Sequence, residues 1–321
     1  MHTHESDLGD ASLRKADLLS VSPIDYSRLF IPESLTQLYY TPQYSQLDSV
    51  QRRRYNHLYA AHTNEQFIFF EHAVGNAISR SLLPVLLELG EVALHERLCK
   101  MIEQEEQHQR MFEKLNQEIF PNLYSDSSHF FIAPSRSMRC LLDAITLFPC
   151  NLHFLLWIAL FFEEFSAEFS RTVLLDAENS GMLEPRFVTL HRQHLRDEVH
   201  HVRLYPDLIR AVIPRCPQWR RTLNGRILKL AIREMLAPKR SGIAVLRQLI
   251  NEHSELRPQQ QQLEQATRAL KNSDEFFNAL FAPDRLPVMH KLFCEFPEFA
   301  WYGYQDFSKS SLNTSFNKET L

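Results

Sequence analysis

Two Glu-x-x-His motifs occur in the chain, Glu105-x-x-His108 and Glu198-x-x-His201, and His194 lies four residues before Glu198. Residues three, four and seven positions apart in an α-helix lie on one face, so each motif presents its side chains to one point. Imidazole suits iron, and carboxylates can bridge two ions. One such motif alone is weak evidence, because a short pattern also occurs on solvent-exposed helices.

Two further carboxylates stand at matched positions upstream of these motifs. Glu71 lies 34 residues before Glu105, and Glu164 lies 34 residues before Glu198. Ferritin-like di-iron and di-manganese proteins take one Glu from each of two helices and a Glu-x-x-His from each of two others. Carboxylates buried in apolar helices without cations would cost many kcal/mol. The sequence therefore predicts a two-metal centre with seven ligands: Glu71, Glu105, His108, Glu164, His194, Glu198 and His201.

Two of these assignments have competitors nearby in the chain. Glu65 competes with Glu71, although its separation of 40 residues from Glu105 breaks the symmetry. Glu163 and Glu168 compete with Glu164. Neighbouring side chains on a helix differ by about 100°, and a bend changes which of them faces the centre. Iron and manganese remain alternatives for the metal.

Several other polar residues are expected to support the ligands. A metal-bound His usually gives its second N–H to a carboxylate or a carbonyl. Asp197 could accept this bond from His108 across the bundle, and Asp143 is another candidate. His191 could support His194 from one turn away, whereas His200 is expected at the surface.

The elements that must position these groups are helices. The chain of 321 residues is 44% hydrophobic, holds only 7 Gly, and contains long apolar-periodic runs rich in Leu, Glu, Gln and Arg. This composition predicts an all-α protein, and together with the order of the Glu and Glu-x-x-His residues it predicts a ferritin-like helical bundle with additional helices. The expected helices span about 48–81, 91–117, 138–148, 152–175 and 184–205, followed by 218–250 with a break at Pro238, 259–281 and 287–296.

The expected organisation is one large domain with flexible ends. Residues 1–20 are polar and are predicted to be disordered, residues 21–305 form a single helical domain, and residues 306–321 form a flexible tail. Within the domain, residues 21–47 are rich in Pro, Tyr and Ser and predict an extended arm with short turns.

Charge and cysteine content exclude several classes of protein. A net charge of −4 and a pI of about 6.4 do not suit a nucleic-acid surface. The apolar stretch 145–162 contains Pro149, Asn151 and His153, so it reads as a buried helix and not as a membrane span. Five cysteines without a Cys-x-x-Cys indicate free thiols. No apolar signal sequence opens the chain, and we expect a cytoplasmic protein without membrane or nucleic-acid partners.

The order Glu, Glu-x-x-His, Glu, His-x-x-x-Glu-x-x-His resembles the di-iron arylamine N-oxygenases of the p-aminobenzoate type, over about residues 29–208. The resemblance implies two iron ions (Fe2+/Fe3+), O2 as co-substrate, a peroxo intermediate, and oxidation of an amine nitrogen to hydroxylamine or nitro. It also implies a small-molecule substrate and an electron donor that the sequence does not identify. Aromatic residues that could line the substrate pocket are Phe67, Phe70, Trp157, Phe161 and Phe165.

Other functions for the same centre are a di-iron hydroxylase or desaturase acting on C–H bonds of a carrier-bound or lipid substrate, and a ferroxidase or iron-storage protein. A ferritin subunit is shorter and lacks the extra His. A non-enzymatic helical binding protein would hold no metal. Large helical bundles often bury a face against a second copy, which suggests a homodimer.

Overall fold

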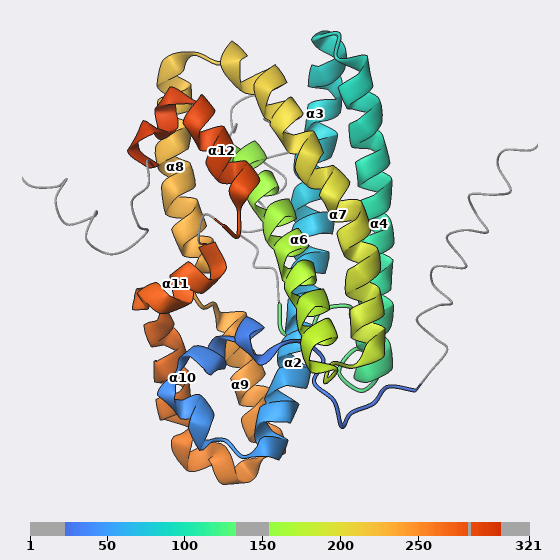
Figure 1. The fold of residues 1–321 in the computed structure, drawn as a ribbon, viewed down its shortest axis with the longest axis vertical. Helices are drawn as coiled ribbons and strands as arrows, with labels where there is room; N and C mark the ends of the chain where they lie inside the picture. Colours follow the sequence, from blue (N-terminus) through green and yellow to red (C-terminus); the bar gives the residue numbers. More distant parts are fainter. Residues whose placement is uncertain (1–22, 133–153, 282–283, 303–321) are drawn as a thin grey trace, which may run out of the picture.

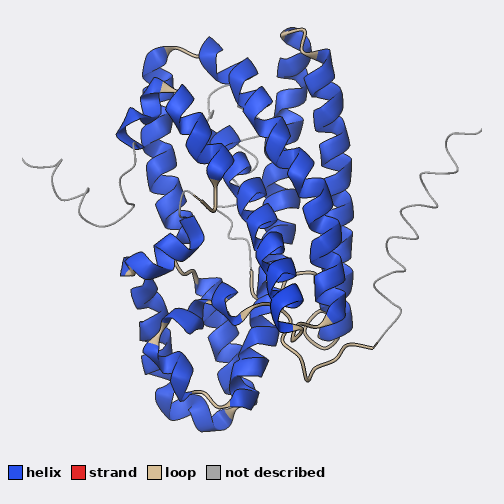
Figure 2. Ribbon diagram, viewed as in Figure 1, coloured by secondary structure: helices blue, strands red, loops and turns tan. Residues whose placement is uncertain are grey.

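The computed structural model describes residues 23–132, 154–281 and 284–302, and these residues are helical with no strand among them. Figures 1 and 2 show long helices side by side. Among these residues, Leu29 and Leu183 form an isolated β-bridge. The predicted all-α bundle with additional helices is confirmed. The predictions for residues 1–20, helix 138–148 with Asp143, and the tail 306–321 lie outside the described residues.

A four-helix bundle forms the centre of the molecule. Its first member is a continuous rod in three parts, and its other members are α4, α6 and α7 (Figure 1). The bounds are α2 Ser49–Phe67, η4 Ile68–Gly75, α3 Asn76–Glu88, α4 Val92–Ile119, α6 Phe154–Ser180 and α7 Pro185–Val212. The first rod is longer than predicted, since it continues beyond residue 81 to Glu88.

Local signals set the ends of these helices. Asp48 accepts hydrogen bonds from the backbone N–H groups of Val50 and Gln51, and the Gln51 side chain closes a capping box. Pro185 opens α7, and the Glu184 side chain caps it. Glycines with a left-handed backbone follow α3 and α6: Gly90 has φ 75° and Gly181 has φ 61°. The first of these turns holds three residues, 89–91, and the second holds four, 181–184.

The segment η4 is a π-helix of eight residues. Its wider turn is rare and occurs often at functional sites. Gly75 ends this segment, and a Cβ at Gly75 would lie 3.2 Å from the backbone oxygen of Phe70. A residue without a side chain therefore suits the wide turn that carries Glu71.

The additional helices form a second layer beside the bundle (Figure 1). They are α8 Gln218–Leu236, α9 Arg240–Glu252, α10 Gln260–Ala269, α11 Asp274–Phe281 and α12 Pro287–Glu295. The expected break at Pro238 separates α8 from α9. The arm before α2 forms three short turns: η1 Glu33–Leu35, η2 Gln37–Tyr40 and η3 Pro42–Gln46. The turns η2 and η3 pack against α10.

The sequence predicted that the chain has no membrane span and that its cysteines are free thiols. Among the described residues, none of the helices has the length and apolar character that a bilayer crossing requires. The apolar stretch 145–162 is described only from Phe154, where it forms the buried first turns of α6. Cys99, Cys216 and Cys294 are free thiols, and the other two cysteines lie outside the described residues.

Candidate metal centre

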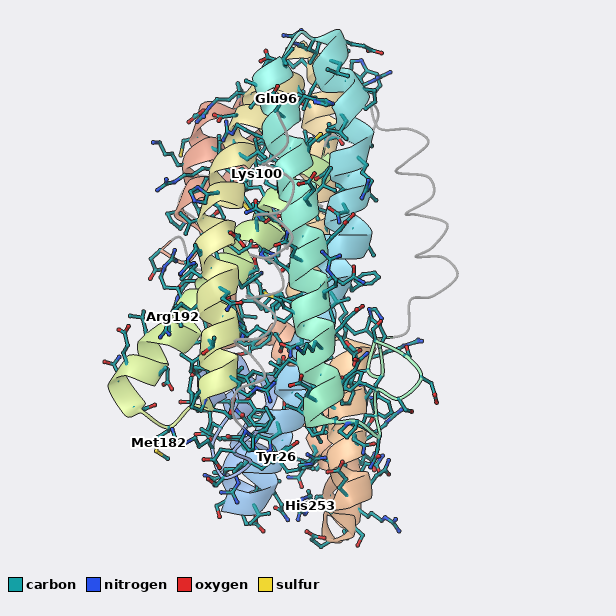
Figure 3. All side chains as sticks on the ribbon, turned by 90° about the vertical axis from the view of Figure 1, so that its right-hand side faces the viewer. Tyr26, Glu96, Lys100, Met182, Arg192 and His253 are labelled. Atoms are coloured by element: carbon teal, nitrogen blue, oxygen red, sulfur yellow. The ribbon has the colours of Figure 1, made fainter. Side chains whose placement is uncertain are left out.

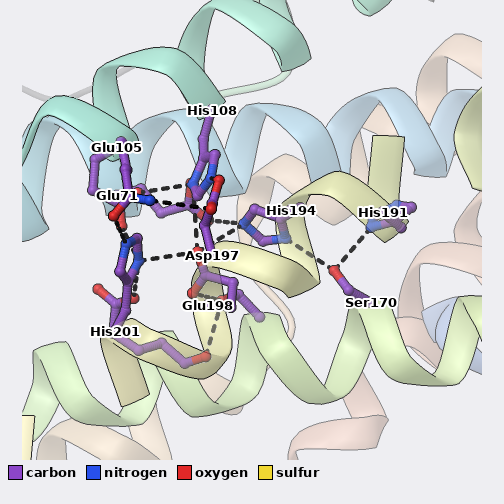
Figure 4. A network of polar contacts seen from close by, with 12 residues as sticks. Glu71, Glu105, His108, Ser170, His191, His194, Asp197, Glu198 and His201 are labelled. Atoms are coloured by element: carbon purple, nitrogen blue, oxygen red, sulfur yellow. Dashed lines mark hydrogen bonds and ion pairs between the residues drawn. The ribbon is translucent and has the colours of Figure 1, made fainter. Parts of the chain in front are cut away.

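Seven buried side chains from η4, α4, α6 and α7 meet inside the bundle (Figure 4). They form two adjoining groups, and within each group the potential ligand atoms lie within 4.8 Å of one another. One group is Glu71, His108 and His194, and the other is Glu105, Glu163, Glu198 and His201. The structure thus brings together six of the seven predicted residues, with Glu163 in the place expected for Glu164.

Two carboxylates of the second group, those of Glu105 and Glu198, also lie close to histidines of the first group. Oε1 of Glu198 is 3.4 Å from Nδ1 of His108, 3.2 Å from Nε2 of His194 and 3.3 Å from Nδ1 of His201. Glu105 places Oε2 3.4 Å from Nδ1 of His108 and Oε1 2.7 Å from Nδ1 of His201. Each of these glutamates therefore faces both halves of the cluster and would be able to bind an ion in either half.

The remaining carboxylates face one half each. Glu71 places Oε1 3.1 Å from Nε2 of His194 and Oε2 3.7 Å from Nδ1 of His108. Oε2 of Glu163 lies 3.4 Å from Nδ1 of His201. Ligands about 2.1 Å from one first-row metal ion lie about 3 Å apart at adjacent coordination positions. The separations in the cluster are of this size.

Several buried oxygen and nitrogen atoms of the cluster have no hydrogen-bond partner, and bound cations would satisfy them. Glu105 and Glu198 are fully buried. Buried atoms without a hydrogen bond are Oε2 of Glu71, both carboxylate oxygens of Glu105, Nδ1 of His108, Oε2 of Glu163, Oε1 of Glu198 and Nδ1 of His201. Buried polar atoms are normally satisfied. Here they converge, so the donor set fits two metal ions.

The pKa shifts describe the same charge balance. Burial raises the pKa of Glu163 well above its usual value, and the charges of Glu105 and Glu198 raise it further. Burial opposes the charge of His194, but Glu71 and Glu198 outweigh this effect and raise its pKa to about 9. In the metal-free chain, protons on the histidines thus partly offset the carboxylates.

Polar contacts behind the ligands orient two of the histidines. Nε2 of His108 lies 3.2 Å from Oδ2 of Asp197, as the sequence predicted. Nε2 of His201 lies 3.2 Å from Oε1 of Gln104, and the Gln104 amide donates to Oδ1 of Asp197. With Nε2 as the donor in both rings, each Nδ1 keeps a lone pair facing the centre.

Serines of α6 orient the ligands of α7. The Ser170 hydroxyl lies 2.9 Å from Nδ1 of His194 and 3.0 Å from Nδ1 of His191. Burial lowers the pKa of His191 to about 3, so this ring is neutral, and its Nδ1 can accept a hydrogen bond from the Ser170 hydroxyl. In that arrangement Ser170 accepts from Nδ1–H of His194, and Nε2 of His194 faces the centre as an acceptor. Ser166 donates to Oε2 of Glu198.

The prediction that Glu164 faces the other six residues is wrong. Its carboxylate accepts the backbone N–H groups of Val288 (2.6 Å) and Met289 (2.8 Å) at the start of α12. Helix N-termini leave such donors unsatisfied and favour a negative charge. The equal separation of 34 residues misled because the turn before α7 is one residue longer than the turn before α4. Glu163, 35 residues before Glu198, reaches the matching depth.

The two other competing carboxylates are engaged elsewhere. Glu65 accepts from the Tyr124 hydroxyl and from the backbone N–H groups of residues 130–132, so it fixes the loop after α4. Glu168 pairs with Arg171 and Arg285. His200 is exposed, as expected.

No sequence pattern marks Gln104 or Ser166 as supports of the ligands. Gln104 stands in a polar run that reads as a solvated surface, and Ser166 in an otherwise apolar helix carries no recognisable motif. A usable signal was spacing: Gln104 is four residues before His108, and Ser166 is three residues after Glu163.

A four-helix bundle that gathers buried glutamates and histidines in this order defines a ferritin-like two-metal protein. The family model described as P-aminobenzoate N-oxygenase AurF matches residues 16–283. The chain belongs to this family and is therefore an oxygenase. None of the curated proteins matches the chain.

Proposed function

We propose that the protein holds two iron ions and uses O2 to oxidise the amine nitrogen of a small arylamine to a hydroxylamine or nitro group. The observation that carries this proposal is the buried cluster of four carboxylates and three imidazoles beside an aromatic pocket. The family supports the same reaction. The proposed ligands are Glu71, Glu105, His108, Glu163, His194, Glu198 and His201.

The iron ions would supply O2 activation when bound. The chain's own groups set the conditions for it. Asp197, Gln104 and Ser170 hold the imidazoles in the tautomers that ligation requires. The buried surroundings exclude water, which strengthens every electrostatic interaction at the centre.

A pocket opens beside Glu71 and Ser166, with roughly 970 Å³ of space not filled by protein atoms, part of it open to solvent. Its walls near the centre are aromatic and come from α2, η4 and α6: Phe67, Phe70, Phe161, Phe162, Phe165 and Phe169. Four of these were predicted as lining residues. Trp157 does not line the pocket, because it packs against Phe293, Phe296 and Phe299. Aromatic walls suit a flat aromatic substrate.

The pocket also offers hydrogen-bonding groups away from the centre. His62 is 1% exposed, and neither of its ring nitrogens makes a hydrogen bond. Burial lowers its pKa to about 3, so the ring is neutral and offers one donor and one acceptor. His62 precedes Glu71 by nine residues, about 13 Å along the helix. An arylamine with its nitrogen at Glu71 and a polar group at its far end suits this arrangement.

The test is a reaction with a defined product. Protein loaded with two iron ions per chain and chemically reduced should convert p-aminobenzoate and O2 into the hydroxylamine or nitro compound. Glu105→Gln should abolish this product together with iron binding. Products hydroxylated at carbon, or uptake of many iron ions per chain, would count against N-oxygenation.

A further inference from the structure

A surface hollow between α4 and α7 reaches the outer side of the metal centre. Arg97, Lys100, His200 and Arg203 stand at its rim. Gln104 and His201 also line it. Figure 3 looks onto this face, with α4 and α7 in front and Lys100 and Arg192 labelled. A proposed metal ligand therefore lines a hollow bordered by positive charge.

The hollow connects to both halves of the centre through polar contacts. Gln104 accepts from Nε2 of His201 and donates to Asp197, and Asp197 accepts from Nε2 of His108. The outer nitrogens of two proposed ligands are thus joined by one hydrogen-bonded link behind the hollow. A redox partner on this face would be separated from the metals by little more than these side chains.

The exposed charges of α7 on this face are positive. Arg192, Arg196 and Arg203 are exposed and form one stripe on the helix, opposite the ligands. None of the three makes an ion pair with any described residue. Asp207 is neutralised by Arg97 at 2.8 Å and Arg210 at 3.7 Å.

Two acidic residues of α4, Glu96 and Glu103, are also exposed. Because both glutamates belong to α4, the positive charge of this face is concentrated on α7 and at Lys100. Since the whole chain has a net charge of −4, this stripe is a local feature that can orient an acidic partner. We define the α4–α7 face as Lys100, Arg192, Arg196, His200 and Arg203.

The substrate pocket lies elsewhere. It is lined by residues of the arm before α2, of α2, η4, α6, α9 and α11, and of the chain between α8 and α9, and none of the described lining residues belongs to α4 or α7. Figure 1 places α4 and α7 at one side of the molecule and α8 to α11 at the other. A partner on the α4–α7 face could therefore act while substrate occupies the pocket.

The proposed reaction needs such a partner. Oxidation of an amine to a hydroxylamine places one oxygen atom of O2 in an N–H bond and releases the other as water. The balance is RNH2 + O2 + 2 e− + 2 H+ → RNHOH + H2O, so a reductant must deliver two electrons. We propose, on the basis of the proposed function, that the α4–α7 face docks a small acidic one-electron carrier of the ferredoxin class, which reduces the centre by way of His201 and Gln104.

The test measures reduction of the iron-loaded protein without substrate or O2. The probe is an acidic plant-type [2Fe–2S] ferredoxin reduced beforehand, and its reoxidation is followed by stopped-flow absorbance. The second-order rate constant should fall as salt is added, because steering between opposite charges is screened. The double variant Lys100→Glu with Arg203→Glu should lower the rate constant at low salt by about tenfold or more and remove the salt dependence.

A matched control changes the same amount of charge on another part of the surface. Arg226 is an exposed residue of α8, and Lys271 is an exposed residue of the short 3-10 turn η8, Leu270–Asn272. The double variant Arg226→Glu with Lys271→Glu should keep the rate constant within about twofold of the original. All variants should bind two iron ions and react alike with a small chemical reductant, which shows an intact centre.

Cross-linking locates the contact without any redox readout. A carbodiimide joins ferredoxin carboxylates to nearby lysines, and the cross-link should map to Lys100 and disappear in Lys100→Arg. Equal ferredoxin rates in the two double variants, or cross-links mainly at Lys271, would overturn the docking site. Failure of the chemically reduced protein to oxidise p-aminobenzoate would instead overturn the proposed reaction, and the ferredoxin measurements would still decide the docking.

Discussion

Glu163 and Glu164 are neighbours in α6, yet they serve different parts of the molecule. Oε2 of Glu163 lies 3.4 Å from Nδ1 of His201, whereas Glu164 accepts the backbone N–H groups that begin α12. The angle of about 100° between successive helical residues is enough to separate the two roles.

This pair gives a direct test of the ligand set. Glu163→Gln should lower iron affinity by more than about tenfold, because it removes a charged oxygen from the centre. Glu164→Gln should keep two iron ions per chain and lower the free energy of unfolding by about 1 kcal/mol, because a helix cap is weakened. Iron titration and denaturant unfolding measure the two effects, and the reverse pattern would restore Glu164 as the ligand.

The pH dependence of the metal-free chain follows from His194. Its pKa is raised from about 6.5 in the unfolded chain to about 9 in the folded one. Protonation of His194 therefore adds on the order of 3 kcal/mol to the free energy of unfolding of the metal-free chain. This contribution is complete below pH 6.5 and is lost as the pH rises to 9. The iron-loaded protein should not show this loss, because a metal-bound His194 carries no proton at Nε2.

The same protonation predicts how metal binding responds to pH. Binding should release protons below pH 9, so the apparent iron affinity should rise between pH 7 and 9. Unfolding curves with and without metal, at closely spaced pH values, provide the check. Metal-free stability that rises over this range would contradict the assignment.

Asp197 should matter for affinity although it is not a proposed ligand. Asp197→Ala removes the acceptor for Nε2–H of His108 and the partner of Gln104, and iron affinity should fall by about 10- to 100-fold. Glu178→Ala, at an exposed position of α6, is the matched control and should bind iron normally. Unchanged affinity in Asp197→Ala would show that the contact does not orient His108.

Substitution of Gly75 should lower iron affinity although alanine has the higher helix propensity. In Gly75→Ala, the gain in helix propensity of about 1 kcal/mol opposes a close approach to the Phe70 oxygen. Stability should change little, while iron affinity falls because the segment that carries Glu71 must shift. Gly242→Ala in α9 would meet only the flexible Gln37 side chain, and its iron affinity should be normal.

His62 should control which arylamine binds. His62→Phe should raise the KM for p-aminobenzoate by about 2- to 10-fold, because one buried hydrogen bond is lost. Iron content should be unchanged. Aniline lacks the polar group at its far end, so the KM for aniline should be the same in the original protein and in His62→Phe. An equal loss for both substrates would mean that His62 only shapes the pocket.

The sequence predicted the bundle and six of the seven clustered residues because their signals are local. Glu-x-x-His spacing states which side chains share a helix face, and that relationship does not depend on the rest of the fold. The π-helical segment could not be predicted, since nothing local distinguishes residues 68–75 from an α-helix.

Glu163 and Glu164 could not be separated for a different reason. The choice depends on the length of the turn before α7 and on α12, which lies more than 120 residues further along the chain. Such contacts between distant segments are set by packing and leave no pattern around residue 164. The same reason explains why Gln104 read as a surface residue.

The cap on α12 also carries an evolutionary consequence. The family match ends at residue 283, and α12 begins at Pro287, so the cap joins a helix beyond the matched residues to the residue beside a proposed iron ligand. Selection on the C-terminal helix and selection on the metal centre therefore act on one dipeptide. Relatives that end without this helix should be free to replace the residue at position 164 while keeping the glutamate before it.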